Sequence, residues 1–258
     1  MTTALLTAHQ LAVAKKVLAE ESARRDHLVI SLSGAHAYGF PSPDSDLDLK
    51  AIHIAPTAEL LGLGTPRLSF DRLEVIDGVE IDYTSNELQM ALNGVLKGNG
   101  NYLERLLGTS TIQGSPTLEA LRPLVKRALS RRVHLHYRGF AMSQLHEAQK
   151  GEATAKQLLY VLRTALTGTH LLLTGELVTD LGAICGTYGF VDARALTDAK
   201  RAGERVVLPQ ADRERWFSRL GAVLEALDAA REKSVLPEEP NNAAELEAWL
   251  LEVRRRAF

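Results

Sequence analysis

The sequence is poor in cysteine, has no large excess of charge of either sign and contains no long apolar run. Its single cysteine, Cys185, excludes an internal disulfide, as is typical of proteins from a reducing compartment such as the cytosol. Apolar neighbours favour a buried structural thiol there over a nucleophile. Thirty basic and 32 acidic residues give a net charge of −2, so the overall charge does not indicate a nucleic-acid-binding protein.

The sequence also predicts no signal peptide and no membrane span. No apolar run is long enough to predict a membrane span. Residues 1–25 lack the apolar core of a signal peptide and have the spacing of an amphipathic helix. We therefore expect a cytoplasmic protein with no membrane partner. At 258 residues, of which 45% are hydrophobic, the chain can bury a large core or form two small domains.

The most informative stretch is residues 33–54. An apolar strand, residues 28–32, leads into Gly34, and a loop rich in proline and serine precedes an Asp-Leu-Asp-Leu sequence that contains Asp46 and Asp48. Strand side chains alternate between faces, so these two carboxylates project to the same side. They repel each other unless a cation lies between them, and hard divalent cations take oxygen ligands. A glycine turn can offer backbone N–H groups to a polyphosphate. The pattern predicts a site for moving a phosphorus centre from a nucleotide to a hydroxyl.

A third carboxylate is expected from the hairpin that follows. An Asp-Gly pair joins predicted strands at residues 68–76 and 79–84, which is a strong hairpin signal. Glu80 and Asp82 lie on the same face of the second strand, so either side chain could supply the third acid. Asp82 is favoured because it lies deeper in the strand.

The rest of the chain predicts mainly helices. Ser85 is expected to cap a helix that reaches about Lys97, and from about residue 115 the apolar residues recur three and four positions apart. Thr, Ser, Gly and Pro cluster near residues 109–116 and suggest a boundary. We expect an α+β fold in which residues 1–112 form a small mixed sheet with flanking helices and residues 113–258 form a helical domain.

These residues resemble the DNA polymerase beta-like nucleotidyltransferase superfamily. Its signature is a Gly-Ser turn, roughly ten further residues, an Asp-hydrophobic-Asp strand and a later carboxylate. Residues 38–40, 43–46 and 97–104 are similar to one branch, the RNA repair pathway polymerase-beta-like family, also called RNA-ligase-associated polymerases. The resemblance is dense from about residue 28 to residue 108 and thinner around residues 156–163.

The resemblance implies the site residues and cofactors. Asp46, Asp48 and Asp82 would bind two Mg²⁺ ions, or Mn²⁺, and catalyse transfer of a nucleotide from an NTP. The nucleotide-binding turn would comprise Gly34, Ala35 and His36. Ala35 stands where the superfamily has serine, so a hydroxyl contact to the phosphates is missing. His36 stands where a basic residue is expected and is only partly charged near neutral pH.

The resemblance also implies that a helix of the second domain contacts the NTP. Lys156, Tyr160 and Arg163 are four and three positions apart, which places them on one helix face. Family members place a lysine and a tyrosine from the second domain against the triphosphate or the base. An ordinary polar stripe is the alternative interpretation.

Residues 122–138 carry a local concentration of positive charge without any acidic residue; its members are Arg122, Lys126, Arg127, Arg131, Arg132, His134, His136 and Arg138. The run predicts an RNA partner beside the NTP, and a solvated helix face is the alternative. An RNA end in RNA repair is therefore the favoured acceptor. A protein side chain or a small molecule such as an aminoglycoside antibiotic is the first alternative. A non-catalytic binding module or antitoxin-like partner with a degenerate site is the second.

Overall fold

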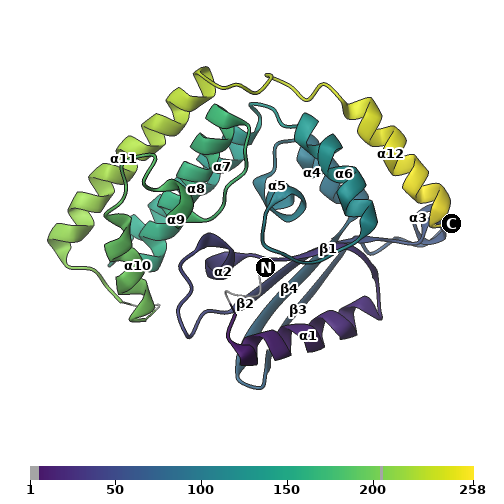
Figure 1. Ribbon diagram of the computed structural model, residues 1–258, viewed down its shortest axis with the longest axis horizontal. Helices are drawn as coiled ribbons and strands as arrows, with labels where there is room; N and C mark the ends of the chain where they lie inside the picture. The colour runs from purple at the N-terminus through teal and green to yellow at the C-terminus, as the bar shows by residue number, and fades with distance from the viewer. Residues whose placement is uncertain (1–5, 204–205) are drawn as a thin grey trace. The chain divides into compact units, whose positions relative to one another are not determined.

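The computed structural model describes residues 6–203 and 206–258, which form two compact units (Figure 1). The first, here called the sheet unit, comprises Met1–His36, Asp46–Ala128 and Pro240–Phe258. The second, the helical unit, comprises Ala37–Ser45 and Leu129–Glu239.

A five-stranded mixed sheet organises the sheet unit, with the strand order β3-β4-β2-β1-β5. β2 and β4 run parallel, and every other neighbouring pair is antiparallel. The predicted α+β fold with a small mixed sheet is therefore confirmed. The strands are β1 (Asp26–Leu32), β2 (Leu47–Ile54), β3 (Ser69–Ile76), β4 (Val79–Glu87) and β5 (Thr111–Gly114).

The predicted hairpin between β3 and β4 is also confirmed. Asp77 and Gly78 form its two-residue turn with φ angles of 50° and 80°. Positive φ at both central positions matches the right-handed twist of the flanking strands, and aspartate followed by glycine tolerates it best.

The prediction that Ser85 caps a helix is wrong. β4 continues to Glu87 because it pairs with β2 on one side and β3 on the other, and the Ser85 hydroxyl lies 2.8 Å from His53 Nδ1. The cap of the next helix, α4 (Leu88–Leu96), is Glu87, whose carboxylate accepts a hydrogen bond from the backbone N–H of Gln89.

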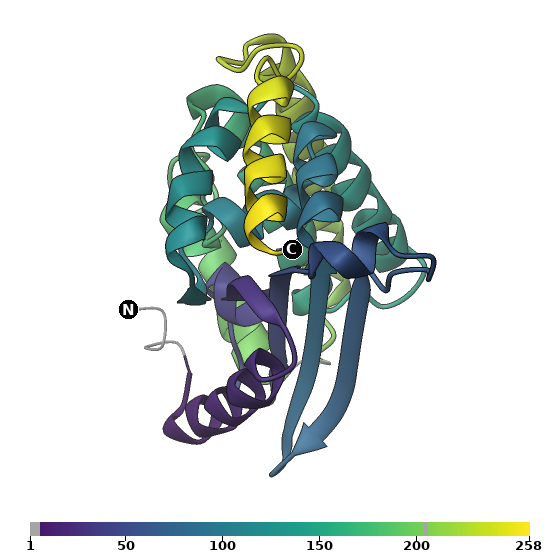
Figure 2. The ribbon, with the colours of Figure 1, turned by 90° about the vertical axis from the view of Figure 1, so that its right-hand side faces the viewer.

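Helices cover both faces of the sheet (Figures 1 and 2). On one face lies α1 (Ala8–Ser22), where Arg72 of β3 donates hydrogen bonds to Glu20 and Glu21. On the other lie α4, α5 (Gly100–Leu107) and α6 (Pro116–Arg127). The guanidinium of Arg105 on α5 donates to Asn86 Oδ1 of β4, which identifies the face that this helix covers.

The C-terminal helix α12 (Ala243–Arg256) belongs to the sheet unit. Arg254 of α12 lies 2.6 Å from the fully buried carboxylate of Glu87, and its carbonyl accepts a hydrogen bond from Thr57, the first residue of α3 (Thr57–Leu61). The predicted division between residues 112 and 113 falls inside β5, which pairs with β1, and the compact units divide after Ala128 instead.

The helical unit confirms the predicted helical character of the second half of the chain. It contains α7 (Val133–Gln149), α8 (Ala155–Thr174), α9 (Leu181–Ile184), α10 (Ala193–Arg201) and α11 (Gln210–Glu232). The long helix α8 is its core: Thr154 and Gln157 form a reciprocal cap at its start, and most of its side chains are buried. Within residues 6–203 and 206–258, no helix is sufficiently long and apolar for a membrane span.

Candidate functional site

The glycine turn after β1 is shaped around one of the predicted carboxylates. Gly34 opens the short helix α2 (Gly34–Tyr38) with a φ of +59°, a conformation that side-chain-bearing residues rarely adopt. A Cβ atom at this position would lie 2.0 Å from Asp48 Oδ2. Next to it, the Ser33 backbone N–H donates to the Asp48 carbonyl over 3.0 Å. Glycine is needed here because the Asp48 carboxylate lies against the backbone.

The next two residues of the turn point inward. Ala35 is buried, and the side chain of His36 is only 1% exposed. Phosphate contacts at this turn would therefore come from the backbone and not from the imidazole of His36. That the turn binds phosphates stays a prediction.

The sheet register brings two of the predicted acids together. Asp48 of β2 and Asp82 of β4 are direct partners across the parallel pair, and their side chains are 25% and 40% exposed. Asp46 immediately precedes β2 and is half-buried. Glu80 lies before the first paired position of β2 and β4 and is exposed, so the register places Asp82, and not Glu80, beside Asp48.

A lysine that is not among the predicted site residues lies between these acids. Lys50 Nζ is 2.6 Å from Asp82 Oδ1 and 3.8 Å from Asp48 Oδ1, and its side chain is only 17% exposed. The same ammonium is 3.3 Å from the Asp82 carbonyl oxygen and 3.5 Å from Thr84 Oγ1. The signal was present in the sequence, because residue 50 follows Asp48 by two positions and so shares its strand face.

The donor set fits a hard divalent cation in its chemistry, since carboxylate oxygens from adjacent strands are ligands that Mg²⁺ and Mn²⁺ accept. The geometry is that of a site closed by an internal ion pair. Over the residues that the structure describes, no three His, Cys, Asp or Glu side chains gather as a metal-holding group. The cation beside Asp48 and Asp82 in this structure is the ammonium of Lys50.

The residues predicted to contact the nucleotide from the second domain lie on α8 in the helical unit. Tyr160 packs edge-on against the rings of Tyr38 and Phe40, with centroid separations of 5.8 and 5.5 Å. The guanidinium carbon of Arg163 lies 3.6 Å from the centroid of Tyr38, and Arg163 is 4% exposed. Lys156 is half-buried. Tyr160 and Arg163 are thus part of an aromatic cluster and not of a solvated stripe, and the role of all three toward an NTP stays a prediction.

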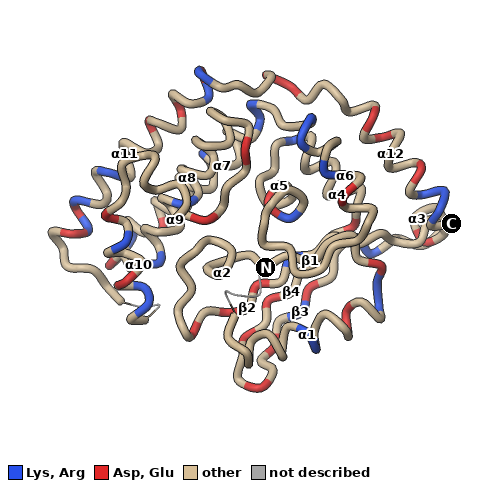
Figure 3. The backbone as a smooth tube through the Cα atoms, in the orientation of Figure 1, with Lys and Arg blue, Asp and Glu red and all other residues tan. Residues whose placement is uncertain are grey.

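The basic run of residues 122–138 is largely paired with acids. It divides between the two units after Ala128. Figure 3 shows acidic and basic residues interspersed along α11, whereas in α12 the acidic residues come first and the basic residues lie in the last turn. The ion pairs are Arg122–Glu119, Arg127–Glu245, Arg131–Glu238, Arg132–Glu239 and Arg138–Asp228. Because five of its arginines have carboxylate partners, the run is not a simple patch of positive charge, and the RNA partner stays a prediction.

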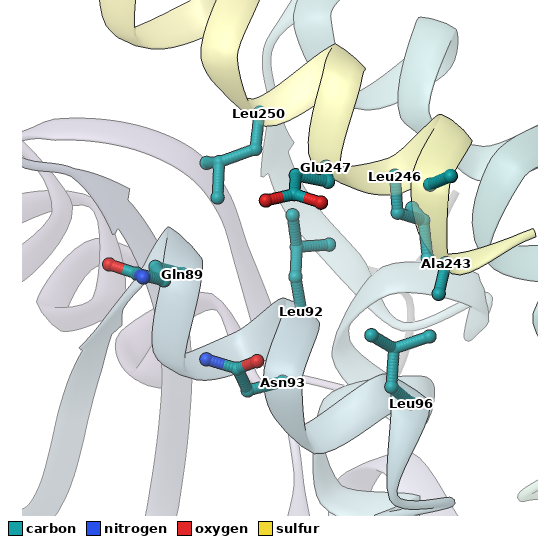
Figure 4. A pocket seen from close by; sticks show the side chains of 9 residues that line it. Gln89, Leu92, Asn93, Leu96, Ala243, Leu246, Glu247 and Leu250 are labelled. Carbon is teal, nitrogen blue, oxygen red and sulfur yellow. The ribbon is translucent and has the colours of Figure 1, made fainter.

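Two hollows are lined by none of the predicted site residues. In the sheet unit, a groove of about 350 Å³ lies between α4 and α12, where Leu92 points toward Glu247 and Leu250 (Figure 4). In the helical unit, a hollow of about 410 Å³ is lined in part by Phe40 and Cys185. Cys185 is partly exposed, so the expectation of a buried thiol is wrong; the residue follows the short helix α9 and faces the hollow.

The glycine turn, the mixed sheet and the helices that follow agree with the fold of DNA polymerase beta-like nucleotidyltransferases. Residues 12–252 match the RNA repair pathway DNA polymerase beta family, and the chain belongs to this family. The resemblance seen in the sequence is thereby confirmed.

Two individual proteins are similar to the chain. Uncharacterized protein MJ0002 of Methanocaldococcus jannaschii is 28% identical over 160 residues, which are 60% of this chain and 64% of that protein. The chain thus spans less than two thirds of the length of this curated relative. A nucleotidyltransferase-like protein from Exiguobacterium sibiricum, known from a crystal structure, is 11% identical with a TM-score of 0.34; the match covers 94% of this chain and 78% of that one.

Proposed function

We propose that the chain is a metal-dependent nucleotidyltransferase that moves a nucleoside monophosphate from an NTP to an acceptor hydroxyl. The observation that carries this proposal is the direct pairing of Asp48 with Asp82. The pair lies beside a turn whose positive φ and close approach to Asp48 favour glycine at position 34. Membership in a polymerase-beta family supports this reaction class.

In the proposed reaction the acceptor oxygen forms a bond to the α-phosphorus, and the bond from that phosphorus to the bridging oxygen of the β-phosphate breaks. Pyrophosphate leaves. Asp46, Asp48 and Asp82 would hold Mg²⁺ or Mn²⁺, which supplies charge neutralisation and a lowered pKa for the acceptor hydroxyl when bound. Asp82 could also accept the hydroxyl proton, since it is the more exposed of the paired acids. Gly34 lets the backbone approach the phosphates.

Residues of the helical unit are proposed to bind the nucleotide. Lys156 would act on the triphosphate as a point charge. The ring of Tyr160 offers an apolar surface for the base, and the contact between Arg163 and Tyr38 holds this aromatic cluster in place.

The proposed acceptor is an RNA end, because the family belongs to an RNA repair pathway. The ion pairs of residues 122–138 favour, as a second candidate, an acceptor that needs no basic surface, such as a small molecule or a protein side chain. A non-catalytic module is the third candidate, and it is favoured by one observation: the Lys50 ammonium already compensates the charge of one of the paired acids.

The proposal is tested by incubating the protein with each labelled NTP and Mg²⁺ or Mn²⁺, with RNA, DNA or no acceptor. Asp48→Asn should reduce transfer by at least about 100-fold, the order of magnitude seen when a group that stabilises transition-state charge is removed. Glu80→Gln is the matched control, because Glu80 lies on β4 with Asp82 but before the first position at which β4 pairs with β2, and its transfer rate should equal that of the wild type. Equal rates for Asp48→Asn and wild type would refute the site. Transfer to RNA alone would select the RNA-repair acceptor.

A further inference from the structure

We infer that the ammonium of Lys50 competes with the divalent metal ion for the carboxylates of Asp48 and Asp82. Its ammonium takes the place of a cation in the metal-free protein and thereby sets the affinity of the site for metal. The inference rests on the proposed function, because it assigns the metal to the same two acids.

The contacts of Lys50 show that its ammonium is held in place. Three oxygen atoms lie within 3.5 Å of Nζ: Asp82 Oδ1 at 2.6 Å, the Asp82 carbonyl at 3.3 Å and Thr84 Oγ1 at 3.5 Å. An ammonium has three N–H donors, so these acceptors can satisfy all of them. The side chain is mostly covered, which sets Lys50 apart from a solvated surface lysine.

The strand register explains why the lysine reaches across to the neighbouring strand. β2 and β4 run parallel, Asp48 pairs with Asp82 and Lys50 pairs with Thr84. Side chains two residues apart on a strand share a face, so all four groups lie on the same face of the sheet. Nζ is nearer to the acid of β4 than to Asp48 on its own strand. The pairing of β2 with β4 therefore builds the Lys50 contact.

Electrostatics gives the ammonium its function. Two like charges directly opposite each other on paired strands destabilise the sheet, and Lys50 compensates one of them in the metal-free protein. A divalent ion bound by Asp48 and Asp82 must displace the ammonium or bind beside it against charge repulsion. In both cases Lys50 opposes the ion. The flexible four-carbon stem of lysine allows the ammonium to leave Asp82 when the ion arrives.

The test measures Mn²⁺ binding without nucleotide, by electron paramagnetic resonance of the free ion, and therefore does not depend on activity. Lys50→Met removes the competing charge and should lower the dissociation constant for Mn²⁺ by about tenfold or more, because a like charge within about 4 Å is lost. Lys50→Arg keeps the charge and should bind Mn²⁺ as the wild type does. Lys15→Met is the matched control: it removes an exposed lysine of α1 and should leave the dissociation constant unchanged.

A second neutral variant guards against misfolding. Lys50→Gln can still donate hydrogen bonds to the Asp82 carbonyl and to Thr84, and it should also bind Mn²⁺ more tightly. The same dissociation constant for wild type and for a folded neutral variant would overturn the inference, as would weaker binding by that variant. If the wild type still transfers nucleotides in that case, the proposed function stands and only the role of Lys50 fails. Absence of Mn²⁺ binding in all proteins, with no transfer, would overturn both.

Discussion

Gly34 shows how one residue without a side chain decides where a carboxylate lies. At a φ of +59° an alanine is strained by roughly 1–2 kcal/mol, and its Cβ would also lie 2.0 Å from Asp48 Oδ2. Gly34→Ala should therefore lower the free energy of unfolding by at least about 1–2 kcal/mol and displace Asp48. The matched control is Gly64→Ala, because Gly64 has an ordinary φ and open space around its Cβ position. Urea unfolding of both variants checks the prediction, and equal midpoints would contradict it.

The spacing of site residues within one segment could be predicted from the sequence, whereas contacts between side chains on different strands could not. The spacing of Asp46 and Asp48 and the glycine before them are features of neighbouring residues. The contact between Lys50 and Asp82 depends on which residues of β2 and β4 are paired, and these neighbouring strands are separated in the sequence by α3 and β3. A shift of one residue would turn Asp82 to the other face. For this reason the sequence predicts uncompensated acids and does not reveal that Lys50 contacts Asp82.

At the scale of elements, a buried lysine of α10 donates hydrogen bonds to the segment Ala37–Ser45 within the helical unit. Lys200 is fully buried, and Nζ donates to Ser42 Oγ over 2.7 Å and to Ser45 Oγ over 2.9 Å. The backbone N–H of Ser42 also donates to Ser45 Oγ. Ser45 is therefore the central acceptor of the cluster, and it lies next to Asp46 in the sequence.

Ser45→Ala should destabilise the protein by about 1–3 kcal/mol, the cost of removing an acceptor from buried donors. The loss should be clearly smaller in a Lys200→Met background, because the buried ammonium that needs the acceptor is then absent. Urea unfolding of the wild type, the two single variants and the double variant gives this coupling. Strict additivity of the two changes would show that Lys200 and Ser45 do not act together.

Most elements follow from local sequence patterns, and the exceptions have tertiary causes. The Asp-Gly turn and the amphipathic helices are specified by nearby residues, and the structure has them. Ser85 has the residue type of a helix cap, but pairing on both sides extends β4 past it, and its hydroxyl bonds to His53 instead. Strand pairing here outweighs the preference of serine for a helix N-cap.

At the scale of the whole molecule, the two compact units are not continuous in sequence. The sheet unit includes the C-terminal helix, which the buried ion pair between Arg254 and Glu87 joins to the start of α4. The segment Ala37–Ser45 belongs to the helical unit, where Lys200 and Tyr160 contact it. A composition change near residue 112 cannot reveal such long-range contacts, so the predicted domain ranges differ from the compact units.

The core of the sheet unit holds two neutral histidines that should make it sensitive to acid. Burial lowers the pKa of His27 to about 4, helped by repulsion from His53 when that histidine is also protonated and from the charge of Arg25. Burial also lowers the pKa of His53 to about 4, helped by Arg25 and Arg254. Unfolded histidines titrate near 6.5, so the unfolded state binds more protons between about pH 6.5 and pH 4. Stability is therefore fully present above about pH 6.5 and is lost as the pH falls toward 4.

Between pH 7 and pH 5, each histidine should remove on the order of 2 kcal/mol from the free energy of unfolding. His27→Gln should reduce this pH-dependent loss, because glutamine does not titrate and can still hydrogen-bond with the Tyr83 hydroxyl, which lies 2.7 Å from His27 Nε2. His9→Gln, at an exposed position of α1, is the matched control and should leave the difference between the two pH values as in the wild type. Urea unfolding at pH 7 and pH 5 measures all three proteins. A loss in His27→Gln as large as in the wild type would show that His27 is not held neutral in the core.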